Sequence, residues 1–266
     1  MYRIFLIIVS LLLFTSCSEL QKALKSEDVG VKYSTAEKLY EKGKYKQSIR
    51  LFDQIATSYR GKPQAEKMFY MYSQAYYKTE QFYTAGYQFE NFTSSYPKSE
   101  KAEEAMYLSA YCYAQLSPVY SLDQTDTYKA MEKLQAFIDK YPNSAFIPQV
   151  NETYKVLKHK IEKKEYEIAK QFYTIEDYKG AIIAFDNFIS DFPGTPLKED
   201  ALYYKFDAEY LYAINSIESK MIERFKLAET YYNKLIQFKS DTKYREKADK
   251  RMEDIKNRLN NIKNTK

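Results

Sequence analysis

The stretch AEKLYEKGKYKQSI at residues 36–49 contains the pattern that decides the fold. Leu39 lies near the end of an amphipathic segment, and Gly43 follows at a position where helices commonly stop. A second segment starts at Tyr45 and has the small residue Ser48 three positions later. Since residues three and four apart share a helical face, the stretch predicts two helices joined by a tight turn.

Four segments share the spacing of this second helix, and they begin at Tyr45, Phe82, Thr127 and Tyr178. Each has a small residue three positions after its start, large apolar residues at seven and ten, and an aromatic residue at fourteen. A proline follows in three of the four segments, whereas the first has Arg60 there. The spacing follows one helical face, and proline ends a helix because it lacks an N–H group. A weaker fifth copy begins at Phe225.

Each of these segments is preceded by another helical pattern; three early ones span 32–42, 64–78 and 102–115, and a long one spans 149–172. When the segments 64–78 and 102–115 are aligned, Cys112 stands at the position equivalent to Ala75. This position favours a small, buried packing role for the cysteine. Helix pairs with small residues at the crossing and a closing proline resemble tetratricopeptide (TPR) repeats. The sequence therefore predicts an all-α fold, an α-solenoid of about five TPR-like helix pairs that becomes irregular toward the C-terminus.

The first residues of the chain resemble a bacterial lipoprotein signal. An uncharged apolar run extends from Ile4 to Phe14, and two small polar residues then lead into Cys17. The run is well short of the ~20 residues that span a bilayer, so we expect a signal peptide over residues 1–16. The pattern resembles a lipobox, which implies that Cys17 is lipidated. The alternative is an ordinary cleaved signal that contains a cysteine.

These patterns divide the chain into five segments. We expect a signal peptide at 1–16, a lipid-anchored tether at 17–31, N-terminal TPR units at 32–117, C-terminal TPR-like units at 118–240 and a basic helix or tail at 241–266.

Positive charge is concentrated at the C-terminal end. The chain has 41 Lys and Arg against 36 Asp and Glu, and the whole formal excess of +5 lies in residues 239–266. We expect an acidic partner or anionic headgroups to be contacted by Lys243, Arg245, Lys250 and Arg251. The alternative is a solvated helix with no partner.

No catalytic constellation is recognisable in the sequence. His159 is the only histidine, so histidine metal clusters and Ser-His-Asp arrangements have little to build on. The 6 glycines are scattered and form no phosphate-binding loop. We therefore expect no enzyme activity, cofactor, metal or nucleic-acid partner, and interpret the protein as a binding scaffold.

A candidate binding groove follows from the repeat register, because the first helix of each TPR pair lines the concave side. This register places there Tyr40, Tyr70, Gln74, Tyr77, Tyr107 and Tyr111, with Glu41 and Lys78 at the edge. Tyrosine rings offer contact area at low rotamer cost, and their hydroxyls can bind a peptide backbone. The alternative is that these rings pack between neighbouring repeats.

The combination of a lipobox, a short tether and about five TPR units with longer C-terminal repeats resembles the BamD family of outer-membrane β-barrel assembly lipoproteins. The helix ends at 95–99 and 140–144 add to the resemblance. It implies a lipid-anchored protein on the periplasmic face of the outer membrane. Its partners would be a BamA-like barrel-forming subunit, other members of that complex and unfolded outer-membrane proteins. The groove would then face substrate, and the region from Lys220 onward would dock.

Three other classes of protein remain as alternatives. A TPR lipoprotein could serve as pilotin for a pilus or secretion pore. A SusD-like glycan-capturing lipoprotein is disfavoured, because those chains are much longer and this one has no Trp. A peptidoglycan-cleaving enzyme would need a catalytic Glu in a cleft, and nothing in the sequence marks one.

Overall fold

A computed structural model describes residues 19–264, and within them the protein is all-α, as predicted. The predicted signal peptide and the lipidation site at Cys17 lie outside these residues. Contacts between residues divide the chain into two compact units. The helix α8 (Ile147–Thr174) belongs to the first unit up to Leu157 and to the second from Lys158 onward.

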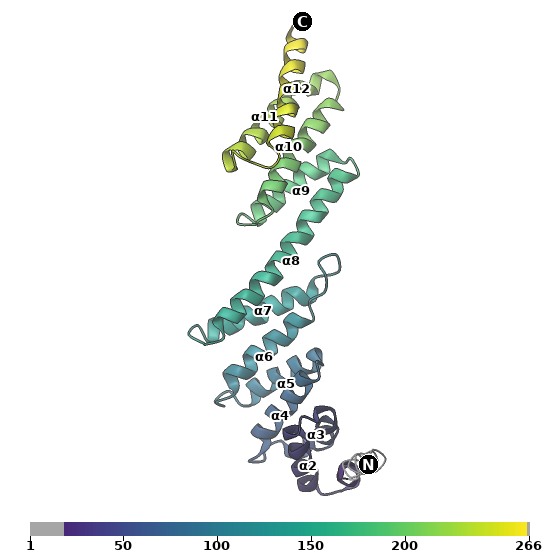
Figure 1. The fold of residues 1–266 in the computed structure, drawn as a ribbon, viewed down its shortest axis with the longest axis vertical. Helices are drawn as coiled ribbons and strands as arrows, with labels where there is room; N and C mark the ends of the chain where they lie inside the picture. Colours follow the sequence, from purple (N-terminus) through teal and green to yellow (C-terminus); the bar gives the residue numbers. More distant parts are fainter. Residues whose placement is uncertain (1–18, 265–266) are drawn as a thin grey trace, which may run out of the picture. The chain divides into compact units, whose positions relative to one another are not determined.

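The first unit consists of stacked helix pairs that follow one another in sequence order (Figure 1). Its helices before α8 are α2 (Val29–Glu41), α3 (Tyr45–Tyr59), α4 (Ala65–Lys78), α5 (Phe82–Ser95), α6 (Ala102–Gln115) and α7 (Thr125–Lys140). The turn between α2 and α3 depends on Gly43, whose φ of +70° lies in the left-handed region that glycine adopts without a steric penalty. The predicted helix starts at Tyr45 and Phe82 are confirmed.

The second unit repeats the helix-pair arrangement, and its helices are longer from α10 onward. It contains α9 (Tyr178–Asp191), α10 (Lys198–Ile214), α11 (Glu218–Phe238) and α12 (Arg245–Asn264). The start at Tyr178 is confirmed, whereas α7 begins two residues before Thr127 and α11 seven residues before Phe225. The extension of α7 is polar, whereas that of α11 includes Met221 and Ile222, which the repeat spacing does not mark.

Small residues lie at the helix crossings, as the repeat predicts. The residue at this register position is fully buried in each of the helices α3, α5, α7 and α9. The four residues are Ser48, Ala85, Ala130 and Ala181. The Ser48 hydroxyl donates a hydrogen bond of 2.8 Å to the carbonyl of Ala36 on the preceding helix. Such close approach leaves no room for a larger side chain, which explains why the small residue recurs in each pair.

Two features differ in position from the expected segments. Residues 19–25, within the segment expected to be a tether, are helical, and Leu20 and Ala23 are buried in the core of the first helix pairs. The two compact units divide within α8, whereas the sequence marks a change of repeat regularity near residue 118. The first half of α8 contributes apolar residues to a core of the first unit, and its second half contributes them to a core of the second unit. The two halves therefore belong to different units.

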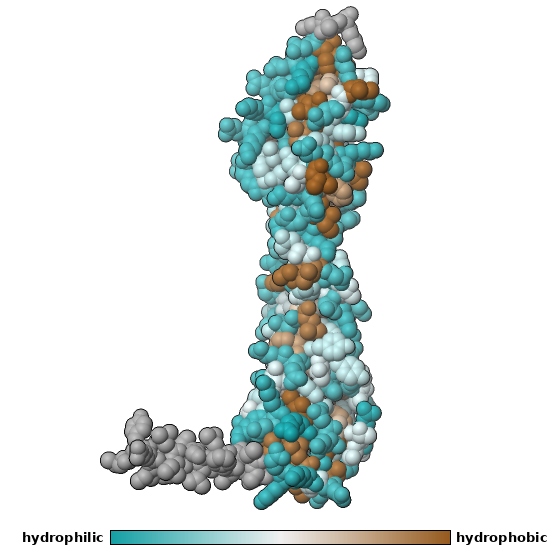
Figure 2. Space-filling view, turned by 90° about the vertical axis from the view of Figure 1, so that its right-hand side faces the viewer, coloured by the Kyte–Doolittle hydropathy of each residue, from teal (hydrophilic) through white to brown (hydrophobic). Residues whose placement is uncertain are grey.

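The face of the molecule displayed in Figure 2 is mostly polar. On the face displayed in Figure 2, apolar residues form small separate patches within hydrophilic surroundings. Among residues 19–264, none of the helices combines the length and the apolar composition that crossing a bilayer requires.

Candidate protein-binding site

The residues predicted to line a groove come from the first helices of three successive pairs. Tyr40 lies on α2, Tyr70, Gln74 and Tyr77 lie on α4, and Tyr107 and Tyr111 lie on α6. The five tyrosines are half-buried and Gln74 is buried. Because 70, 74 and 77 are spaced i, i+4 and i+7, their side chains share one face of α4.

Tyr40 and Tyr70 line the same cavity, which has a volume of about 550 Å³. Met71 and Phe92 contribute apolar surface to it. Its charged lining consists of Glu41, Glu66, Lys67 and Lys101. The amide of Gln74 donates a hydrogen bond of 2.8 Å to the Tyr70 hydroxyl, and the Lys101 ammonium lies 5.5 Å from the centre of the Tyr70 ring. An apolar floor between charges of both signs suits a peptide with mixed side chains.

The hydroxyls of this cavity remain protonated at neutral pH. Burial raises the pKa of Tyr70 well above its ordinary value, and the nearby Glu104 raises it further, although the hydrogen bond from Gln74 acts in the opposite direction. Burial also raises the pKa of Tyr40, with smaller contributions from Tyr45 and Glu104. The Tyr40 hydroxyl can therefore donate a hydrogen bond to a carbonyl oxygen, whereas the Tyr70 hydroxyl is hydrogen-bonded to Glu104.

The other predicted groove tyrosines form a chain of ring contacts. The Tyr77 and Tyr111 ring centres are 6.2 Å apart, as are those of Tyr111 and Tyr107. The Tyr107 ring stacks on Phe146 at 4.4 Å. The Lys78 ammonium lies 5.7 Å from the Tyr77 ring centre. Packing between successive helix pairs accounts for Tyr107, whereas the cavity beside Tyr40 and Tyr70 leaves room for a ligand.

The residues predicted to dock a partner lie on or just before α12, and most of them are paired within the chain. Lys243 forms an ion pair of 2.5 Å with Asp200, and Arg245 forms one of 2.8 Å with Asp249. Arg251 forms one of 3.1 Å with the buried Asp207. These contacts neutralise much of the charge that the sequence places at this end of the chain.

Lys250 differs from the other three. It is exposed, and with Lys247, Tyr203 and Tyr210 it lines a cavity of about 390 Å³ beside Arg251. Neither Lys247 nor Lys250 forms an ion pair with a residue of the part that the structure describes. These two lysines are cations of α12 available to an acidic partner, and the exposed Lys256 of the same helix also forms no ion pair within the described residues.

Groups that could carry chemistry are separated from one another. Within residues 19–264, no cluster of three or more His, Cys, Asp or Glu side chains could hold a metal ion. Cys112 is fully buried, as predicted, and burial raises its pKa to about 12. The imidazole of His159 is half-exposed and lies 3.5 Å from Glu162 on the same helix.

Sequence reasoning missed two groups of lining residues. Lys67 and Lys101 reach the Tyr40 cavity from the starts of α4 and α6, and neither position is marked by the apolar repeat. Arg60 lines another cavity of the first unit, together with residues of α5. A signal for Arg60 is present in the sequence, because it replaces the proline that follows the other three repeats.

This chain belongs to the YfiO family, described as outer membrane lipoprotein, whose pattern matches residues 26–224. The match includes the helices that carry the Tyr40 cavity and ends within α11, before the basic helix α12. Membership places the chain among outer membrane lipoproteins.

Within that class, the chain is similar to the outer membrane protein assembly factor BamD of Caulobacter vibrioides. The two are 22% identical over 183 residues, which make up 69% of this chain and 60% of that relative. The aligned part thus spans less than two thirds of the relative's length.

Proposed function

We propose that this protein is a non-catalytic scaffold of the outer-membrane β-barrel assembly complex. In this role the helix pairs of the first unit bind unfolded segments of outer-membrane proteins, and the C-terminal region docks on a BamA-like barrel-forming subunit. Family membership and the similarity to an assembly factor support the role. The proposed binding of unfolded substrate rests on the cavity between Tyr40 and Tyr70.

The chemistry of this cavity suits an unfolded chain better than a folded surface. The protonated Tyr40 hydroxyl can donate to a backbone carbonyl, and the two rings with Met71 and Phe92 can contact apolar side chains. Charges of both signs around the cavity tolerate many sequences, because neither acidic nor basic side chains are excluded. A scaffold that meets many substrates needs this tolerance.

Docking on the barrel-forming subunit is assigned to α12. Lys247 and Lys250 are exposed and unneutralised, so they favour an acidic surface on the partner. The ion pairs of Lys243 and Arg251 join the start of α12 and the residues before it to α10, and the ion pair of Arg245 lies within α12. Together they fix the conformation of this region. In this proposal those three residues position the docking surface, while Lys247 and Lys250 contact the partner.

Membrane attachment in this proposal depends on acylation of Cys17 after removal of residues 1–16. Two or more acyl chains anchor a protein stably, since each buried CH₂ contributes about 0.8 kcal/mol. The helix pairs would then face the periplasm. Replacement of Cys17 by serine should abolish incorporation of labelled palmitate and release the protein from the membrane fraction.

The assembly role can be tested by affinity purification of the full chain from detergent-solubilised envelopes, followed by mass spectrometry. We expect the barrel-forming subunit to co-purify, and we expect the double variant Lys247→Glu, Lys250→Glu to lose it. Deletion of α12 is a poorer test, because Ala248, Met252 and Ile255 are buried and their loss would disturb the second unit.

Substrate binding needs its own variant. Tyr40→Ala should reduce cross-linking to unfolded outer-membrane proteins and retain the barrel-forming subunit. The matched control is Tyr128→Ala, which removes an exposed tyrosine of α7 away from the cavity. Recovery of a secretin or of a TonB-dependent sugar transporter, with no barrel-forming subunit, would contradict the assembly role.

A further inference from the structure

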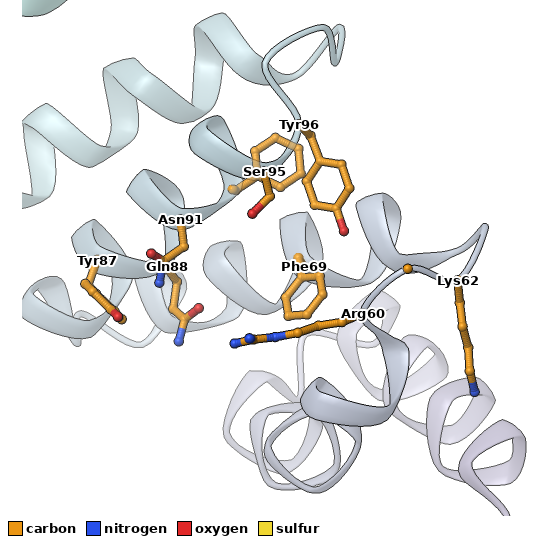
Figure 3. A pocket seen from close by; sticks show the side chains of 10 residues that line it. Arg60, Lys62, Phe69, Tyr87, Gln88, Asn91, Ser95 and Tyr96 are labelled. Carbon is orange, nitrogen blue, oxygen red and sulfur yellow. The ribbon is translucent and has the colours of Figure 1, made fainter.

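A second cavity of the first unit lies between the turn that joins α3 to α4 and the helix α5. Its volume is about 640 Å³, and it shares only Phe92 with the cavity beside Tyr40. Figure 3 shows the Arg60 side chain extended beneath Phe69, with its guanidinium directed toward Gln88 and Asn91 of α5. The cavity is therefore lined by two cations (Arg60 and Lys62), two amides and aromatic rings.

The next repeat contains an equivalent cavity, which makes an internal comparison possible. That cavity has a volume of about 400 Å³. Pro97 and Met106 occupy there the register positions of Arg60 and Phe69, and Lys133 occupies the position of Gln88. Two of these three differences, at the positions of Arg60 and Gln88, change a charged or hydrogen-bonding group.

Each cavity is lined by two cations, and the cavities differ in whether a carboxylate lies among the lining residues. In the second one, Lys133 forms an ion pair of 2.7 Å with Glu90 of α5. In the first, Arg60 forms no ion pair with any residue of the described part of the chain, and no Asp or Glu lines the cavity. The Arg60 guanidinium can therefore form a bidentate contact with a carboxylate supplied by another molecule.

The conformation of the turn holds Arg60 in this position. Arg60 stands directly after α3, with φ of −56° and ψ of 127°. Gly61 follows with φ of +79°, in the left-handed region. The other three repeats place proline at the position of Arg60, so helix termination alone does not explain an arginine there.

The remaining lining suits a peptide. Gln88 and Asn91 are separated by three residues on α5, so their amides lie on one face and offer both donors and acceptors to a peptide backbone. Tyr87 is 54% exposed at the same cavity and offers a ring face to an apolar or aromatic side chain. A volume of 640 Å³ is far more than a single small anion needs.

We propose that this cavity is a second peptide-binding site, which takes an extended acidic segment of a partner protein. Arg60 binds a carboxylate of that segment, Gln88 and Asn91 bind its backbone, and Tyr87 with Phe69 contacts an adjacent aromatic side chain. The site acts independently of the cavity beside Tyr40, so the proposal does not depend on the substrate role assigned to that cavity.

The test uses two fluorescein-labelled peptides and the full mature chain. One has the sequence Gly-Ser-Asp-Phe-Glu-Tyr-Asp-Gly-Ser, and its matched form has Asn and Gln in place of Asp and Glu. Fluorescence anisotropy should show binding of the acidic peptide and binding at least about tenfold weaker for the matched form, since a charged hydrogen bond is lost. Arg60→Glu should abolish binding, and Gln88→Ala should weaken it.

Two control variants separate this site from its neighbours. Lys133→Ala alters the equivalent cavity of the next repeat, and Tyr128→Ala removes an exposed tyrosine of α7 that lines neither this cavity nor the one beside Tyr40; both should leave the affinity unchanged. Arg60 and Gln88 are not part of the buried core, so circular dichroism should show that these variants fold.

Four results of the binding assay would overturn the proposal. These are equal affinity for the two peptides, unchanged affinity in Arg60→Glu, equal loss in Lys133→Ala, and no binding of either peptide at concentrations up to about 1 mM. Displacement of the acidic peptide by inorganic phosphate alone would identify a simple anion site instead. Displacement by an N-acetylglucosamine oligomer would identify a glycan site, and either result rejects peptide recognition.

Discussion

Arg251 on α12 donates a hydrogen bond of 3.1 Å from Nε to Oδ1 of Asp207 on α10. Asp207 is only 2% exposed, and its other oxygen accepts a bond of 2.6 Å from the hydroxyl of Tyr173 on α8. The guanidinium also lies 4.5 Å from the centre of the Tyr210 ring. One buried carboxylate therefore joins three helices of the second unit.

Replacement of Arg251 by methionine should destabilise the protein, because it leaves a buried carboxylate without its cation. We expect a loss of about 2–3 kcal/mol in the free energy of unfolding, measured by urea denaturation. The double variant Asp207→Asn, Arg251→Met should recover part of this loss, since no uncompensated charge remains.

Arg258 provides the matched control for this prediction. It pairs with Asp254 on the same helix at 2.6 Å, and both side chains are more than a third exposed. Arg258→Met should therefore change stability by less than about 0.5 kcal/mol. If Arg251→Met and Arg258→Met cost the same, burial of Asp207 does not decide the strength of the contact.

The stability of the second unit should depend on pH through Glu209. This side chain is 3% exposed on α10, and burial raises its pKa to about 7, opposed by Arg224 and Lys205 and reinforced by Glu223. A raised pKa means that the folded state holds a proton that the unfolded state has released between about pH 4.5 and 7. Stability should therefore fall as pH rises through this window, by up to about 3 kcal/mol.

Glu209→Gln tests the assignment, because glutamine keeps the shape of the side chain and does not titrate. Urea denaturation at pH 5 and pH 8 should show the fall in the natural chain and a much smaller change in the variant. A pH dependence that is the same in both proteins would mean that other groups cause it.

Some features of the fold could be predicted from the sequence because they depend on short-range patterns. The small residue three positions into each repeat, such as Ala85, is buried at a crossing, and the pattern requires this without knowledge of the partner helix. Side-chain pairing could not be predicted in the same way. Lys243 pairs with Asp200, far away in the sequence, and only the packing of α12 against α10 brings them together.

The candidate site shows the same division. The i, i+4, i+7 spacing of Tyr70, Gln74 and Tyr77 predicts a shared face of α4. Which tyrosines stack on neighbours and which border a cavity depends on distances between helices. The stacking of Tyr107 on Phe146, a residue of the loop before α8, follows from no local pattern.

Gly86 on α5 should resist replacement by alanine, although alanine favours helix formation by about 1 kcal/mol. An added Cβ would lie 3.3 Å from Cβ of Cys112 and 3.3 Å from a ring carbon of Tyr113, and both residues are buried on α6. We expect Gly86→Ala to lower the free energy of unfolding by about 1 kcal/mol, because crowding outweighs the gain in propensity. An increase in thermal stability instead would show that α6 can move away without cost.

The last prediction concerns Glu199, which holds the segment before α12 onto the start of α10. Its carboxylate accepts bonds from the Lys239 ammonium at 2.9 Å, the Thr242 hydroxyl at 2.7 Å and the backbone N–H of Lys243 at 2.9 Å. The bond from Lys239, together with those from Thr242 and Lys243, lowers the pKa of Glu199 to about 2 despite partial burial. A lowered pKa gives stability that is present above about pH 4.5 and is lost as pH falls toward 2. Glu199→Gln should therefore cost about 2 kcal/mol at pH 7 and progressively less in acid, and hydrogen exchange should show faster opening of α12 at neutral pH. Equal exchange rates in the variant and the natural chain would mean that the apolar contacts of α12 alone hold it in place.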